Sequence, residues 1–278
     1  MKQRTVFFVS DQTGITAQTL GRSLLTQFDG MKFRHVTVPF ISTPDKAHDA
    51  VRRINLVAEV EGVRPLVFST FVHNEVREIV RGCNGLLLDF FDAFIGPLER
   101  ELERASSHTS GRAHGLADDA AYARRIEAVN FTLANDDGIG VQNYGRADLI
   151  LVGVSRSGKT PTCLYLALQY GVYAANFPLT DEHFEGAGGE LPSVLRPHLR
   201  KLVGLTIDAK RLEQIRVNRR PDSRYASASQ ISFELREAEA LFKRNAIPYL
   251  DTTHASIEEI AMRVLDSTGL RDRVEAQP

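Results

Sequence analysis

Short apolar runs alternate with longer amphipathic segments along the first hundred residues of the chain. Each run is rich in β-branched and aromatic residues and is followed by a polar loop and a segment of helical length. This alternation is typical of βαβ units and a parallel sheet. The expected strands are residues 5–9, 36–40, 65–68 and 86–90, and the expected helices are residues 15–28, 44–60 and 73–81.

The pattern is interrupted and then begins again further along the chain. Residues 105–119 are rich in Ser, His, Thr, Gly and Arg without apolar periodicity, and a helix is expected at 120–134. A second α/β unit then follows, with strands at 149–152, 172–176 and 202–207 and helices at 159–170, 209–217 and 257–265. We therefore predict an α/β protein with an amino-terminal parallel-sheet domain (1–105), a connector that contains a helix (106–145) and a second α/β domain (146–278).

A phosphate-loop motif lies between the first strand and the first helix of the second domain. The motif G-x-x-x-x-G-K-[ST] is matched at every fixed position, and it requires the strand before it and the helix after it. Pro161 falls in the first helical turn, where a missing N–H is tolerated. The residues expected to hold a nucleotide phosphate are Gly153, Val154, Ser155, Arg156, Ser157, Gly158, Lys159 and Thr160.

Each residue type in this loop has a physical role in phosphate binding. The glycines let backbone N–H groups curl around phosphate oxygens, and the helix amino terminus adds a partial positive charge. Lys159 supplies a cation for the outer phosphates, and the Thr160 hydroxyl is a candidate Mg²⁺ ligand. We accordingly predict that residues 146–278 form a P-loop kinase domain.

Phosphoryl transfer also requires a carboxylate, and two positions offer one. Asp208 closes the apolar strand at 202–207, where an acidic Mg²⁺ or base residue is expected, but it is equally suited to cap the next helix. Asp137 lies in the turn Asp136-Asp137-Gly138, which also reads as an Asx turn, and it reaches the loop only if the chain folds back. Lys159, Asp208 and Asp137 are therefore the predicted catalytic residues. Of the two carboxylates, Asp208 is the one expected to act on Mg²⁺ or on the incoming hydroxyl, and the Asx turn is favoured for Asp137.

Four arginines lie at the end of the helix at 209–217 and just after it. They either clamp a transferring phosphate or form a solvated basic face, and the solvated face is favoured for most of them. These residues are Arg216, Arg219, Arg220 and Arg224.

Composition narrows the class of protein further. The 278 residues carry a net charge of −1, which provides no overall attraction to nucleic acid or to an anionic membrane. Only two cysteines occur, and the first apolar run is too short for a signal peptide or a membrane span. We predict a cytoplasmic protein that binds neither nucleic acid nor membrane.

Two other functions fit the phosphate loop on its own. One is a P-loop kinase for a small metabolite, and the other is a nucleotide-sensing regulator without chemistry. A GTPase is disfavoured because no N-K-x-D sequence follows the loop.

Segments along nearly the whole chain resemble the phosphoenolpyruvate synthase regulatory proteins. The similarity includes the loop and its helix, GVSRSGKTPTCLY at 153–165, and it continues on both sides of them. The other matching segments are SDQTGITAQTLG at 10–21, GVRPLVF at 62–68, RIEAVNFTLANDDG at 125–138, GLTID at 204–208, SRYAS at 223–227 and IEEIA at 257–261.

This resemblance implies a bifunctional enzyme. One activity is an ADP-dependent Ser/Thr kinase that phosphorylates a threonine of phosphoenolpyruvate synthase and inactivates it. The other activity removes that phosphate with inorganic phosphate as acceptor and releases pyrophosphate. A sister family acts in the same way on pyruvate, phosphate dikinase, and the sequence at 158–165 favours the synthase branch. The implied ligands are ADP, phosphate or pyrophosphate and Mg²⁺. The sequence is compatible with either a monomer or a homodimer.

Overall fold

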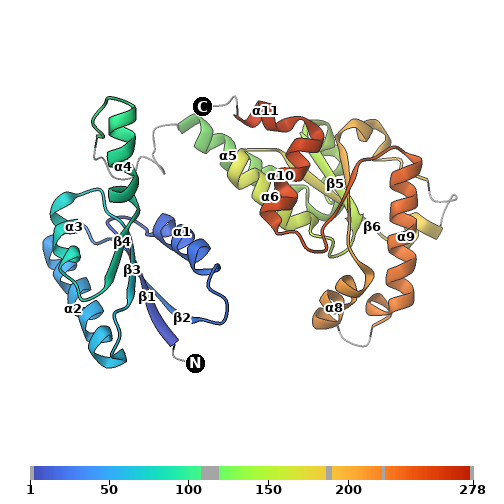
Figure 1. Ribbon diagram of the computed structural model, residues 1–278. Coiled ribbons are helices and arrows are strands. Elements are labelled where there is room, and N and C mark those ends of the chain that lie inside the picture. Colours follow the sequence, from blue (N-terminus) through green and yellow to red (C-terminus); the bar gives the residue numbers. More distant parts are fainter. Residues whose placement is uncertain (1–2, 108–118, 186–189, 221–222, 276–278) are drawn as a thin grey trace. The chain divides into compact units, whose positions relative to one another are not determined.

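The computed structural model describes residues 3–107, 119–185, 190–220 and 223–275. The chain forms two compact units, Met1–Ala117 and Asp118–Pro278 (Figure 1). Each unit contains a four-stranded sheet in which every pairing is parallel, so the predicted α/β class is confirmed. The helix that the sequence analysis placed in the connector, α5 (Asp119–Ala134), belongs to the second unit, and positions 108–118 of that connector lie outside the described residues.

The first unit is a parallel sheet with strand order β2-β1-β3-β4. Its central strand carries a wholly buried apolar run, and the two faces of the sheet are covered by separate apolar clusters. The strands are β1 (Gln3–Ser10), β2 (Lys32–Val38), β3 (Leu66–Thr70) and β4 (Leu86–Asp89), and the helices are α1 (Ile15–Leu25), α2 (Pro44–Glu61), α3 (Asn74–Arg81) and α4 (Phe90–Glu101).

Helix α4 was not expected from the sequence, which placed strand up to residue 90. The chain turns into the helix at this point because the Asp89 carboxylate accepts a hydrogen bond from the Asp92 backbone N–H at 2.8 Å. The apolar residues Phe90 and Phe91 therefore belong to the first helical turn and do not extend the strand.

The second unit has strand order β6-β5-β7-β8. It is larger than the first unit, and helices cover both faces of its sheet (Figure 1). A separate cluster of buried apolar residues lies on each face. The strands are β5 (Leu149–Val154), β6 (Ala174–Leu179), β7 (Leu202–Thr206) and β8 (Tyr249–Asp251). The α-helices after α5 are α6 (Lys159–Tyr170), α7 (Asp181–Glu185), α8 (Ala209–Arg219), α9 (Ala228–Arg244), α10 (Ile257–Thr268) and α11 (Leu270–Glu275). The 3-10 turns are η2 (Asp136–Gly138), η3 (Val141–Arg146), η4 (Arg196–Lys201) and η5 (Arg224–Ala226).

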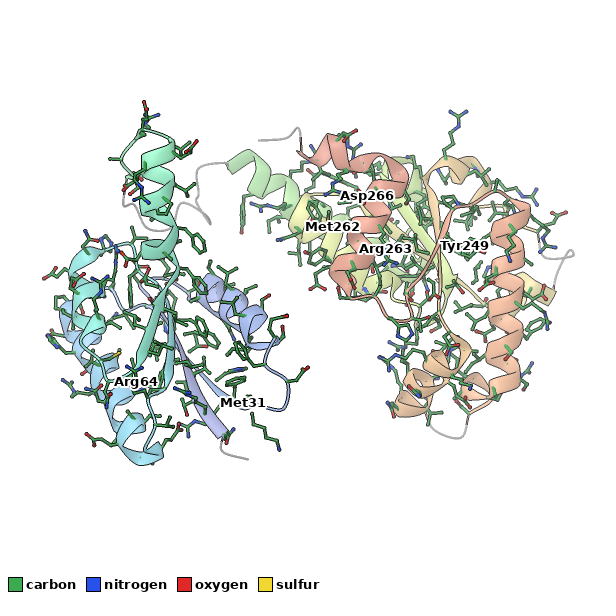
Figure 2. The ribbon with its side chains drawn as sticks, in the orientation of Figure 1. Met31, Arg64, Tyr249, Met262, Arg263 and Asp266 are labelled. Atoms are coloured by element: carbon green, nitrogen blue, oxygen red, sulfur yellow. The ribbon has the colours of Figure 1, made fainter. Side chains whose placement is uncertain are left out.

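Helices α6 and α10 share one face of this sheet, and α9 covers the other. Leu166 of α6 and Val264 of α10 are fully buried in one cluster, whereas Ile231 and Phe242 of α9 are fully buried in the other. The Tyr170 hydroxyl of α6 also lies 3.2 Å from the sulfur of Met262 in α10, so a polar contact joins the two helices of the first face. Met262 is labelled in Figure 2. Packing on both faces explains why every residue of β5 is buried.

The two sheets have the same order of strands. In each, the first strand in sequence lies between the second and the third, so the connections leave it in opposite directions. Ligands of open α/β sheets bind in the crevice at the carboxyl ends of the strands where this reversal occurs. In the second unit, that position between β5 and β7 is occupied by the phosphate-loop sequence.

None of the described helices has the length and apolar character needed to cross a membrane.

Candidate phosphate-binding site

The predicted loop connects β5 to α6 as the motif requires. The strand ends at Val154 and the helix begins at Lys159. Gly158, the N-cap of α6, has φ 95°, and no side chain caps the helix, so its first N–H groups are available to an anion. Arg156 is exposed and also adopts a left-handed φ of 75°, a conformation rarely seen outside glycine and often found at functional loops.

Glycine is required at the start of the loop because the chain passes close to β7. A Cβ atom at Gly153 would lie 2.5 Å from the Leu205 carbonyl oxygen and 2.9 Å from the Ser157 hydroxyl. The Ser157 Oγ is buried and has no hydrogen-bond partner within the part of the chain that the structure describes. A buried hydroxyl without a protein partner suits a loop that is completed by a ligand.

Lys159 is folded back onto its own loop. Its side chain is buried, with 4% of the residue exposed, and its Nζ donates a hydrogen bond to the Val154 carbonyl oxygen at 3.0 Å. Burial lowers the pKa of Lys159 to about 8, and the nearby negative charges of Asp137 and Asp136 partly oppose that shift. The ammonium is thus desolvated beside carboxylates, the state in which it gains most from an incoming phosphate.

The acidic turn η2 does fold back to the phosphate loop. The Thr160 Oγ1 donates a hydrogen bond to Asp136 Oδ1 at 2.8 Å. The buried Asn176 of β6 donates its Nδ2 to the same carboxylate oxygen and accepts the Asp137 backbone N–H at 3.0 Å. Asn176 is therefore hydrogen-bonded to both aspartates and holds the turn beside the loop.

The edge of the sheet explains why the turn lies here. β6 is an edge strand, and its outer backbone groups are paired with the segment around the turn. Thr132 donates to the Ala174 carbonyl at 2.8 Å, and Tyr144 donates to the Asn176 carbonyl at 2.9 Å. The Asn176 N–H in turn donates to the Asn135 carbonyl at 3.4 Å. Covering an exposed edge in this way satisfies its hydrogen bonds and holds η2 against β6.

The two predicted carboxylates have different surroundings. Asp137 is exposed, has a left-handed φ of 47°, and is the carboxylate whose charge acts most on Lys159. Asp208 is also exposed, and its Oδ1 accepts the Arg211 backbone N–H at 3.0 Å, so it caps α8. Since β7 lies beside β5, Asp208 is at the carboxyl edge as expected, and its catalytic role stays a prediction.

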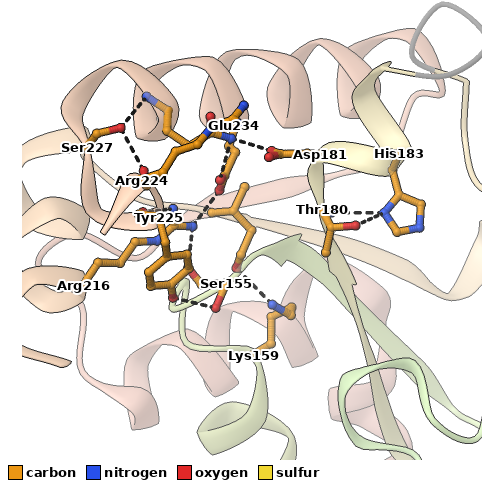
Figure 3. Close-up of polar contacts among 12 residues, drawn as sticks. Ser155, Lys159, Thr180, Asp181, His183, Arg216, Arg224, Tyr225, Ser227 and Glu234 are labelled. Carbon is orange, nitrogen blue, oxygen red and sulfur yellow. Dashed lines mark hydrogen bonds and ion pairs between the residues drawn. The ribbon is translucent and has the colours of Figure 1, made fainter. Parts of the chain in front are cut away.

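One residue of the arginine cluster, Arg216 of α8, contacts the phosphate loop. The Arg216 side chain is fully buried, forms an ion pair of 2.6 Å with Glu234, and donates to the Ser155 carbonyl at 3.1 Å (Figure 3). The Tyr225 ring lies against its guanidinium at 4.1 Å, and the Tyr225 hydroxyl is hydrogen-bonded to the Ser155 Oγ at 2.8 Å. The other three, Arg219, Arg220 and Arg224, are exposed, as a solvated face predicts.

The network behind Arg216 extends to a third element. Gln230 donates to Glu234 at 3.2 Å and also to Asp181 of α7. Glu234 and Asp181 are labelled in Figure 3. A buried ion pair with further hydrogen bonds fixes its members tightly, and here it braces the backbone of Ser155. Sequence reasoning missed Asn176, Tyr225 and Glu234; a polar residue within the apolar run 172–176 was the one available signal for Asn176.

The fold and the loop define a parallel α/β protein with a phosphate-loop sequence at the carboxyl edge of a central strand. The model of the kinase/pyrophosphorylase family matches residues 6–265, and the chain belongs to that family. A relative from Marinobacter nauticus is 52% identical over 269 residues, which are 97% of this chain and 98% of the relative. Relatives from Pseudomonas putida strain W619 and Legionella pneumophila strain Corby are also 52% identical, over 98% of this chain and 99% and 100% of their own lengths. All three relatives are named "Putative phosphoenolpyruvate synthase regulatory protein".

Proposed function

We propose that this protein is a bifunctional regulator of phosphoenolpyruvate synthase. In one reaction it transfers the β-phosphoryl group of ADP to a threonine hydroxyl of that enzyme, and in the other it transfers the group from phosphothreonine to inorganic phosphate. The observation that carries the proposal is a buried lysine beside two aspartates in a phosphate loop, in a chain of the kinase/pyrophosphorylase family. The name that the relatives carry supports the choice of target.

One phosphate cradle is sufficient for both reactions. In the kinase direction, the bond between the β-phosphorus and the oxygen of AMP breaks, and a bond to the threonine oxygen forms. In the other direction, an oxygen of inorganic phosphate attacks the phosphothreonine phosphorus, and the threonine oxygen leaves with a proton. Both transfers place two adjacent phosphates on the loop, so positioning and charge neutralisation are the main tasks of the protein.

Residues of the loop and of the segments around it have different tasks in this proposal. The open N–H groups at the start of α6 and the Lys159 ammonium hold the transferring phosphate and its developing charge. In this proposal Asp137 accepts the proton of the threonine hydroxyl in one direction and returns it in the other, because its charge acts on Lys159, and Asp208 is the alternative base. Arg216 holds the backbone of Ser155 and keeps the loop in shape.

The oxygen donors at the loop fit Mg²⁺. Thr160 provides a hydroxyl and the turn η2 provides carboxylates, which are the ligand types that Mg²⁺ combines with substrate phosphates. Thr160 would hold the ion, which when bound neutralises phosphate charge. The proposed setting for all of this chemistry is the cytoplasm.

The experiment is to incubate the protein with phosphoenolpyruvate synthase and ADP labelled in the β-phosphate. We expect label on a threonine of the synthase, and its release as pyrophosphate after unlabelled inorganic phosphate is added. Label on pyruvate, phosphate dikinase alone would move the target to that enzyme. Transfer only from the γ-phosphate of ATP, or only to a small metabolite, would contradict the proposal.

A further inference from the structure

Asp136 contacts the phosphate loop directly, although it lies outside the motif. Its Oδ1 accepts the Thr160 hydroxyl at 2.8 Å and also the side-chain amide of Asn176. Among the described residues, no hydrogen bond to its Oδ2 is found, and the residue is partly exposed. One oxygen thus orients the carboxylate and the other is available to a ligand.

The position of this carboxylate in the chain is unusual for a phosphate-loop sheet. The acidic partner of the loop hydroxyl commonly comes from the end of a neighbouring strand. Here that strand is β7, whose following aspartate, Asp208, directs its carboxylate to the Arg211 N–H. The acid that reaches Thr160 comes from a turn that precedes β5 in the sequence and is held by the edge strand β6.

The ligands present suit a cation that arrives together with phosphate. No group of three or more His, Cys, Asp or Glu residues able to hold a metal occurs in the described parts of the chain. A single carboxylate beside a threonine hydroxyl is too small a set for a metal site made only of protein groups. Mg²⁺ keeps several waters and is often bound by one or two carboxylates plus the phosphates of a substrate.

We propose that Asp136 is the carboxylate that anchors a divalent cation beside Thr160, and that Asn176 is the positioning residue that orients it. The cation binds only with a diphosphate on the loop. Lys159 binds the diphosphate and the adjacent Thr160 hydroxyl binds the cation, so the phosphate oxygens complete the ligands of the metal. This inference rests on the proposed function only in requiring that the loop binds a diphosphate.

The test is a titration of the full-length protein with Mn²⁺, followed by electron paramagnetic resonance, with and without ADP. Wild type should bind Mn²⁺ tightly only when ADP is present. Asp136→Asn should weaken Mn²⁺ binding in the presence of ADP by roughly tenfold or more, the usual effect of losing a ligand or its orienting partner. Asp266→Asn is the matched control, because Asp266 is an exposed residue near the carboxyl end of α10 whose carboxylate contacts Arg271, and it should leave Mn²⁺ binding unchanged. Binding by Asp136→Asn within twofold of wild type would overturn the inference.

A second variant separates direct ligation from a structural role. Asp136→Cys presents a thiolate, which favours Zn²⁺ over Mn²⁺. With ADP bound, this variant should bind Mn²⁺ weakly and Zn²⁺ at least as tightly as wild type does. Weak binding of both metals by a variant with a wild-type circular dichroism spectrum would assign Asp136 a structural role and contradict the inference.

The same experiments distinguish this inference from the proposed function. If Mn²⁺ binding depends on ADP and Asp136 but no threonine is labelled, the metal assignment stands and the proposed reaction fails. If ADP does not bind at all, pyrophosphate replaces it as the probe. Absence of Mn²⁺ binding with either diphosphate would contradict the inference itself.

Discussion

The ammonium of Lys159 donates a hydrogen bond of 3.0 Å to the carbonyl oxygen of Val154, five residues earlier in the same loop. The lysine is buried, and its charge is stabilised by this carbonyl and by the carboxylates of the acidic turn. A phosphate entering the loop replaces a neutral partner by an anionic one. Hydrogen bonds between charged groups are about twice as strong as neutral ones, which favours this exchange.

Lys159→Ala should abolish phosphoryl transfer in both directions while the protein remains folded. Lys159 is the main side-chain cation at the cradle. Its loss should raise the activation barrier by several kcal/mol, which lowers the rate by at least roughly a hundredfold. The measurement is the rate of β-phosphate transfer from ADP and the rate of pyrophosphate release. Lys210→Ala, on the exposed side of α8, serves as control. A folded Lys159→Ala protein with near-normal rates in either direction would refute the single-cradle proposal.

The affinity for ADP should fall as the pH rises above about 8. Because burial lowers the pKa of Lys159 to about 8, the ligand-free protein loses the ammonium above that pH, whereas ADP requires it. The apparent affinity scales with the protonated fraction, so it should be about tenfold weaker at pH 9 than at pH 7. Calorimetric titration at several pH values measures this. In Lys159→Arg the charge persists, and a decline of the same size in that variant would show that another group is responsible.

The same pKa has a consequence for the stability of the ligand-free protein. Lys159 has a lower pKa folded than its ordinary value of 10.5, so the unfolded chain binds more protons between about pH 8 and that value. Stability therefore rises with pH across this window as far as Lys159 contributes. Denaturant unfolding of wild type and Lys159→Met at pH 8 and pH 10 should show the gain in wild type and a smaller one in the variant. An equal gain in both proteins would argue against a buried ammonium.

Asparagine substitution distinguishes the two candidate bases. Asp208→Asn retains a good helix cap, so we expect rates within a few-fold of wild type. Asp137→Asn removes the charge beside Lys159 and should lower the transfer rate by roughly a hundredfold, the usual scale for a positioned base. Single-turnover rates at saturating ADP measure this. A hundredfold loss in Asp208→Asn with an active Asp137→Asn would return the catalytic role to the end of β7.

Gly140→Ala should destabilise the second unit and loosen the acidic turn. A Cβ atom at this position would lie 2.1 Å from Asn135 Oδ1 and 2.7 Å from the Ala134 carbonyl oxygen, so the turn must shift. We expect a loss of about 1–3 kcal/mol in unfolding free energy, the usual range for overpacking. Gly145→Ala is the matched control, because nothing lies within 4 Å of its added Cβ. Equal stabilities for the two variants, measured by urea unfolding, would contradict the crowding at Gly140.

Local sequence was sufficient for the elements that carry the phosphate loop. The predicted helix at 159–170 matches α6 at both ends, because a loop glycine begins it and Gly171, with φ 62°, ends it. The strand at 172–176 was placed too early, since β6 runs from Ala174 to Leu179. The polar Asn176 was taken as the end of the strand, but it lies inside β6. A buried polar residue is tolerated there because its side-chain amide is hydrogen-bonded to the acidic turn.

The site as a whole required contacts between distant segments. The residue types of the motif determined where an anion can bind, since a strand, two glycines and a helix amino terminus are close neighbours in the chain. Which carboxylate meets Thr160 depended on the pairing of the edge strand β6 with residues 132–144, and the burial of Arg216 depended on α9 and η5. Hydrophobic periodicity contains no information about such pairings, because they are formed by single polar side chains whose partners are chosen by the packing of the sheet. The sequence by itself therefore determined the phosphate-loop motif and the strand and helix around it, and the tertiary structure decided which acid contacts Thr160 and which arginine is buried behind Ser155.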